Sequence, residues 1–168
     1  MGPVEITFFV VVGIFIAIAL VRGYNKELGV TTMLLIALFI LEFLSERYQE
    51  LVDQALGMVT SQDTILRPWL FVFFLVLITY ISYQGNTLAF PGSGKSRFFD
   101  VGVGMLNGYL FAGSIWYYLQ QAGWPGLPVI PTYTPAYDAM VRLLPPAVFS
   151  WPYFIALAVL LLIARVWK

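Results

Sequence analysis

Five long apolar runs, separated by polar links, dominate the hydrophobic pattern of the chain. A helix that crosses a membrane needs about 20 consecutive, mostly apolar residues, with a range of about 17 to 25. The runs that reach or approach this length are residues 4–21, 28–45, 68–83, 99–119 and 151–166. The pattern therefore predicts an all-α fold, a polytopic membrane helix bundle of four to five transmembrane helices that forms a single integral membrane domain over residues 1–168.

The first two runs are joined by the six residues from Arg22 to Glu27. So short a link predicts an antiparallel helical hairpin. The segment Ala17-Ile18-Ala19 resembles a signal-peptide cleavage site, but the first positive charges follow the apolar run instead of preceding it. We therefore interpret the first run as a helix that is retained in the protein.

Two segments depart from the pattern of long apolar runs. Residues 45–59 alternate apolar and charged positions at helical spacing, which indicates either an amphipathic helix at the membrane interface or a solvated helical extension. Residues 121–152 carry seven prolines, a density that excludes a continuous helix. We expect this Pro- and aromatic-rich segment to form an external cap on the end of the bundle, with a short amphipathic turn at 136–144.

The placement of Lys and Arg predicts how the chain is oriented. With five crossings, one side of the membrane receives Arg22, Lys26, Lys95, Arg97, Arg165 and Lys168. The other side receives only Arg47, Arg67 and Arg142. Because short cytoplasmic loops carry the excess of Lys and Arg, this bias predicts an external N-terminus and a cytoplasmic C-terminus.

Composition narrows the chemistry. Only 11% of the residues are charged, against about 25% in an average soluble domain, and the formal net charge is zero. The chain has no Cys and no His, which excludes thiolate metal sites, His-ligated haem and the commonest general base. We therefore expect no cofactor, no metal, no enzymatic activity and no nucleic-acid partner. The expected partners are the lipid bilayer, other membrane proteins and further copies of the chain.

The fourth run carries the clearest packing signal. Small residues and one acid recur there every four positions, at Asp100, Gly104, Gly108 and Ala112. Glycines at this spacing let the backbone of another helix approach closely. Asn107 lies near the same face and is placed to hydrogen-bond across it, while Gly13 and Ala17 in the first run are a candidate facing pair.

Three ionisable residues are candidates for a functional role. Glu42 is an acid inside a predicted span, which by default is a functional hypothesis, although it lies about one turn from the helix end, where Arg47 or water would satisfy it. Arg22 closes the first run and Asp100 opens the fourth, so both lie at one membrane face. We predict an interfacial ion pair between them, with a helix cap formed by Asp100 alone as the alternative.

Two local patterns resemble the colicin V production protein (CvpA-like) family of small bacterial inner-membrane proteins. One is Arg22-Gly23-Tyr24 followed by Lys26-Glu27, and the other is the repeat from Asp100 to Ala112. The resemblance covers roughly residues 6–119, and it departs from the family where Ala112 replaces the last glycine of the repeat. It implies a role in the bacterial inner membrane, linked to bacteriocin production or export or to maintenance of the envelope.

Three functional hypotheses follow. The leading one is a non-enzymatic bacterial inner-membrane protein that works by helix–helix association, with itself or with an export or envelope assembly. The second is an accessory subunit of a larger photosynthetic or respiratory membrane complex. The third is a small transporter or channel, for which Glu42 and the Asn107 face are the indications.

Overall fold

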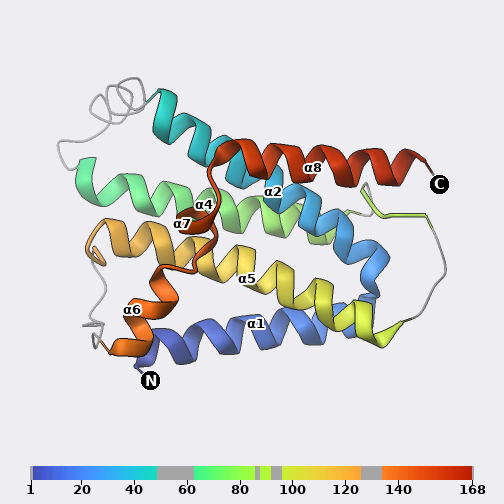
Figure 1. Cartoon of the computed structure of the whole chain (residues 1–168), viewed down its shortest axis with the longest axis horizontal. Coiled ribbons are helices and arrows are strands. Elements are labelled where there is room, and N and C mark those ends of the chain that lie inside the picture. The colour runs from blue at the N-terminus through green and yellow to red at the C-terminus, as the bar shows by residue number, and fades with distance from the viewer. Residues whose placement is uncertain (1, 49–62, 86–87, 92–95, 126–133, 168) are drawn as a thin grey trace.

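The computed structural model describes residues 2–48, 63–85, 88–91, 96–125 and 134–167. Within these ranges the chain forms seven helices and no strand, which confirms the predicted all-α class (Figure 1). The helices are α1 (Pro3–Arg22), α2 (Tyr24–Arg47), α4 (Asp63–Gln84), α5 (Arg97–Gln121), α6 (Pro135–Val141), α7 (Pro145–Val148) and α8 (Trp151–Val166).

Four of the described helices are long and apolar enough to cross a membrane: α1, α2, α5 and the Leu66–Gln84 part of α4. The fifth predicted crossing corresponds to α8, which is apolar but only 16 residues long. The helices α2, α4 and α5 extend beyond the predicted runs, and Pro68 lies inside α4 instead of at its start. The predicted interfacial helix begins within α2, but residues 49–62 lie outside the described part of the chain.

A single glycine separates α1 from α2. Gly23 has a φ of +84°, a left-handed conformation that side chains on L-residues disfavour, and its N–H closes α1 on the carbonyl of Ala19 at 2.8 Å. The predicted six-residue link is therefore helical at all positions except one. The two helices reverse direction so sharply that the first turn of α2 lies beside the last turn of α1.

The helix α5 lies at the centre of the bundle, beside α1 on one side and α2 and α4 on the other (Figure 1). Its residues Leu110 and Tyr118 join the main apolar core, to which α2 contributes one face and α8 contributes Phe154 and Ala158. The helix α8 packs mainly against α2 (Figure 1). The N-terminus and α6 lie at one end of the bundle, and the α1–α2 turn and the C-terminus lie at the other.

The Pro-rich segment does more than cap the bundle end. Thr134 accepts a hydrogen bond from the Tyr137 N–H at 3.0 Å and so starts α6, which overlaps the predicted turn. The chain then runs inward, where Pro145 packs on Gly113. Gly113 lies eight residues before the end of α5, which corresponds to a depth of about 12 Å. The short helix α7 therefore lies partway along the bundle, between α6 and α8 in the chain.

Candidate functional site

The helix α2 places the carboxylate of Glu27 inside the bundle, in the first turn after Gly23. The side chain of Glu27 is 0% exposed. Its Oε2 accepts hydrogen bonds from the Tyr83 hydroxyl at 2.8 Å and from Asn107 Nδ2 at 3.0 Å. Its Oε1 lies 3.6 Å from Nε of Arg22, which is an ion-pair distance and too long for a hydrogen bond. Groups from three other helices thus surround the acid that α2 carries.

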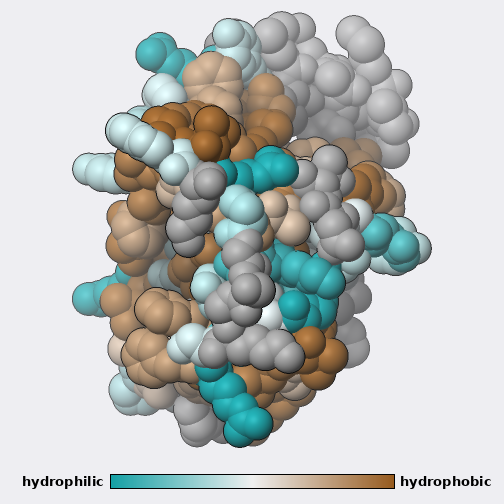
Figure 2. Space-filling model, turned by 90° about the vertical axis from the view of Figure 1, so that its right-hand side faces the viewer, coloured by the Kyte–Doolittle hydropathy of each residue, from teal (hydrophilic) through white to brown (hydrophobic). Residues whose placement is uncertain are grey.

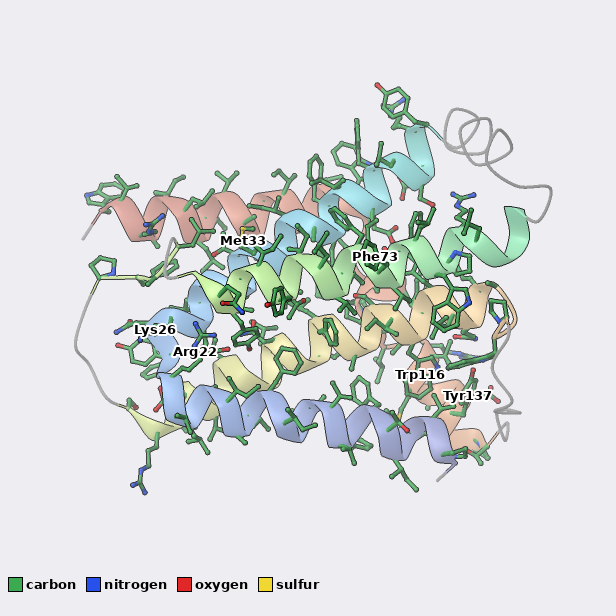
Figure 3. All side chains as sticks on the ribbon, turned by 180° about the vertical axis from the view of Figure 1, so that it is seen from behind. Arg22, Lys26, Met33, Phe73, Trp116 and Tyr137 are labelled. Carbon is green, nitrogen blue, oxygen red and sulfur yellow. The ribbon has the colours of Figure 1, made fainter. Side chains whose placement is uncertain are left out.

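Asn107 connects the same carboxylate to the backbone of α2. Its Nδ2 also donates to the Glu27 carbonyl at 3.1 Å, and its Oδ1 accepts from the Thr31 hydroxyl at 2.6 Å. The guanidinium of Arg22 lies 4.5 Å from the centre of the Tyr83 ring, a cation–π contact. We refer to Arg22, Glu27, Thr31, Tyr83 and Asn107 as the Glu27 cluster (Figure 3 labels Arg22).

The Glu27 cluster is built to hold a charge in place. Burying a carboxylate is costly unless a counter-charge and hydrogen bonds compensate it, and here both are present. Removing the Glu27 carboxylate takes away the acceptor of Tyr83 and one acceptor of Asn107, so the cluster resists its loss. The ion pair and hydrogen bonds of the Glu27 cluster hold α1, α2, α4 and α5 together.

The predicted ion pair joins Arg22 to Asp100, but in the structure each of the two residues contacts a different partner. Arg22 pairs with Glu27, and the Oδ1 of Asp100 accepts the Tyr24 N–H at 2.7 Å. That N–H belongs to the first residue of α2 and has no acceptor within its own helix. Asp100 therefore caps α2 from the neighbouring α5. The two family-like motifs do meet at one end of the bundle, but through a backbone hydrogen bond.

The glycines of α5 lie against α1. A Cβ on Gly104 would lie 2.8 Å from the Cα of Ile16, and one on Gly108 would lie 2.7 Å from the Cα of Val12. These distances are below those of real Cβ contacts, so only glycine permits this approach. Ala112 is buried at 9% exposure further along the same face.

The facing surface on α1 differs from the predicted one. Gly13 and Ala17 lie on the exposed side of α1, and no atom lies within 4 Å of a Cβ built on Gly13. The residues that meet the glycines are Val12, Phe15, Ile16 and Ala19. The physical reason is that glycines on one helix accommodate ordinary side chains on the other, so a second small pair is not needed.

Two further acids are buried at the opposite end of the bundle. Glu42 is 8% exposed and accepts a hydrogen bond from the Tyr118 hydroxyl at 2.7 Å. Its observed partner is therefore an α5 tyrosine, where Arg47 or water was expected. Glu5 is 0% exposed and accepts from the Thr134 hydroxyl at 2.9 Å, which ties α1 to the start of α6.

Sequence reasoning did not single out Glu5 or Glu27 as site residues, because both lie near the ends of apolar runs, where acids are usually solvated. One signal was present for Glu27, since Thr31 lies four residues later on the same helical face and gives that face a polar stripe. No sequence signal pointed to Tyr83 as its donor. The described residues contain no group of three acids or other ligands able to hold a metal.

Comparisons of the chain with protein-family models, with curated proteins and with solved structures gave no match. The resemblance to the CvpA-like family therefore stays a prediction that rests on the two motifs.

Proposed function

We propose that this chain is a non-enzymatic, multi-pass protein of the bacterial cytoplasmic membrane that works by associating with other membrane proteins, or with further copies of itself, in an export or envelope assembly. The observation that carries the proposal is the Glu27 cluster, which ties four helices together at one end. A bundle fixed in this way offers its neighbours a preorganised surface, which lowers the cost of association.

The glycine face is occupied within the bundle, so association has to use other surfaces. The helix α4 offers one, because Phe73 and Tyr80 are 63% and 61% exposed on it. Leu75 on the same helix is 0% exposed and belongs to the core. The outward face of α4 is therefore the surface that we assign to a partner helix.

A photo-crosslinking amino acid placed in α4 tests the proposal in cells. At Phe73 it is expected to capture another membrane protein or a second copy of the chain, and co-purification in gentle detergent identifies which (Figure 3 labels Phe73). The matched control is the same amino acid at Leu75, which is expected to react only within the chain. Capture of lipid alone at Phe73 would reject the association, and capture of cofactor-bearing respiratory or photosynthetic chains would favour the accessory-subunit hypothesis.

The orientation is part of the proposal, with the N-terminus outside and the C-terminus in the cytoplasm. The end that holds the α1–α2 turn carries hydrophilic side chains between apolar flanks (Figure 2), and Arg22, Lys26, Arg97 and Arg165 lie in the elements that meet there. Because the chain lacks Cys, single-Cys variants report cleanly. We expect Ser96→Cys to resist an impermeant thiol reagent in intact cells and Asp138→Cys to react, and the opposite pattern would reverse the topology.

A second candidate function is a small proton-coupled transporter, which the three buried acids favour. Glu5, Glu27 and Glu42 each lie in a helix that is long and apolar enough to cross a membrane, and each accepts a hydrogen bond from a side chain outside that helix. Flux of protons in liposomes separates this candidate from the first. Flux that disappears in Glu42→Gln would support transport, and equal leakage from protein-containing and empty liposomes would remove it.

A further inference from the structure

A small cleft lies between the start of α2 and the end of α4, at the same end of the bundle as the Glu27 cluster. It has a volume of about 50 Å³. The residues that line it include Lys26, Val30, Met33, Ile81 and Ser82 (Figure 3 labels Lys26 and Met33). A cleft of this size holds a few water molecules or one compact polar group, and is too small for a whole drug-sized ligand.

Residues 88–90, which follow α4, form one wall of the cleft. The N–H of Phe90 donates to the carbonyl of Asn25 at 3.0 Å. The backbone of Leu88 lies against Gly29, where a Cβ would lie only 2.6 Å from the Leu88 carbonyl oxygen. Leu88 and Ala89 both line the cleft. These backbone contacts therefore fix the wall against the first turns of α2.

Lys26 brings an uncompensated positive charge to the cleft. Its side chain is exposed, and its ammonium group makes no ion pair or hydrogen bond within the described part of the chain. The two acids of the described residues near this end are buried and have other partners. Glu27 pairs with Arg22, and Asp100 accepts the Tyr24 N–H. The charge of Lys26 is therefore available to an anion from outside the chain.

The surroundings of Lys26 are those of a membrane surface. Arg97 in the first turn of α5 is exposed at the same end, whereas Glu46 and Asp138, the exposed acids among the described side chains, belong to elements at the other end. Val21 and Phe98, 87% and 83% exposed, add large apolar side chains to the end that carries Lys26. Exposed apolar and cationic side chains together suit the boundary between the hydrocarbon core and anionic headgroups.

We propose that the cleft binds the headgroup of an anionic phospholipid, whose phosphate pairs with the ammonium group of Lys26. The acyl chains then lie in the bilayer beside α4, where Ile81 is 49% exposed. A lipid fits this position better than an acidic protein segment does, because the cleft takes one compact group and lies at the ends of two helices able to cross a membrane. The site goes beyond the association role, since it needs no protein partner.

Native mass spectrometry of the full chain in gentle detergent tests the assignment. The probe is an equimolar mixture of phosphatidylglycerol and phosphatidylcholine with identical acyl chains. We expect one retained lipid per chain, with phosphatidylglycerol preferred about fivefold, the effect of one cation near an anionic lipid surface. Lys26→Gln is expected to lower that ratio to about one. Two matched controls are expected to keep the preference: Arg97→Gln, an exposed cation at the same end that does not line the cleft, and Arg142→Gln, an exposed cation at the other end.

A second variant tests the cleft without changing its charge. The Ser82 hydroxyl donates within its own helix, to the Ile78 carbonyl at 2.7 Å, so Ser82→Leu breaks no contact between helices and fills the cleft. We expect it to remove the preference for phosphatidylglycerol, as Lys26→Gln does. A preference that survives in Ser82→Leu would contradict the site.

Other results would also overturn the proposal. Equal retention of the two lipids by the wild-type chain would remove the headgroup selectivity, and an equal loss in Lys26→Gln and Arg97→Gln would mean a diffuse attraction instead of a site in the cleft. Displacement of phosphatidylglycerol by a poly-glutamate peptide would assign Lys26 to an acidic protein segment, and displacement by millimolar inorganic phosphate would assign it to a soluble anion.

Discussion

Glu27→Ala is expected to destabilise the protein by about 3 kcal/mol, the lower end of the loss seen when one partner of a buried ion pair is removed. The substitution takes the counter-charge from Arg22 and the acceptor from Tyr83 and Asn107. Arg22 is 20% exposed, so water compensates part of its charge and the loss stays at the lower end. Thermal unfolding of the purified protein in detergent, followed by circular dichroism, measures the effect.

Two variants make this measurement specific. Glu27→Gln keeps an oxygen acceptor for the two donors and removes only the charge opposite Arg22, so we expect a smaller loss of about 1–2 kcal/mol. Glu46→Ala removes an exposed acid near the other end of α2 and is expected to change stability by less than about 0.5 kcal/mol. Equal stability of Glu27→Ala and Glu46→Ala would mean that the cluster does not hold the bundle together.

Gly108→Leu is expected to destabilise the bundle by about 1–3 kcal/mol, because the new side chain has to displace the backbone of α1 near Val12. Gly104→Leu meets the backbone at Ile16 and is expected to have a similar effect. The measurement is again thermal unfolding, combined with the amount of protein that accumulates in the membrane.

The control for these variants lies in the same helix. Gly102 is exposed, and a Cβ there meets no atom within 4 Å. Gly102→Leu therefore adds the same side chain without a clash and is expected to leave stability unchanged or slightly higher, since leucine favours the helix. If Gly102→Leu and Gly108→Leu unfold at the same temperature, the contact between α1 and α5 is not close enough to require glycine.

Much of the helical architecture could be predicted from the sequence. The length of an apolar run is a local property, and it indicates directly whether a helix is long enough to cross a membrane. The ends of the helices were harder to predict. Asn25 to Glu27 are polar and were assigned to a link, but they continue α2 because Asn107 and Asp100 supply hydrogen bonds from another helix. Such support is tertiary, and no local pattern reveals it. The inward course of the chain at Pro145 depends on Gly113 in the same way.

The candidate site was only partly predictable for a related reason. The repeat of small residues identified the face of α5 that packs, since spacing along one helix is visible in a sequence. The facing residues on α1 were not identified, because only α5 supplies glycines to the close contact. The α1 residues that meet them form no matching repeat of small residues. The contact between Arg22 and Glu27 could not be predicted either, because it depends on the turn at Gly23. That turn brings two residues five positions apart beside each other.

The shortness of α8 has a consequence for the surrounding bilayer. Sixteen residues extend about 24 Å, whereas α5, with 25 residues, extends about 37 Å, and the hydrocarbon core of a bilayer is about 30 Å thick. In a topology where α8 crosses the membrane, lipids beside α8 would therefore meet a negative hydrophobic mismatch that lipids beside α5 would not. The membrane accommodates a short helix by thinning or by drawing flanking polar side chains toward its surface, and Arg165 and Trp167 are placed for this. In that topology the bilayer would be thinner on the α8 side of the bundle than on the α5 side.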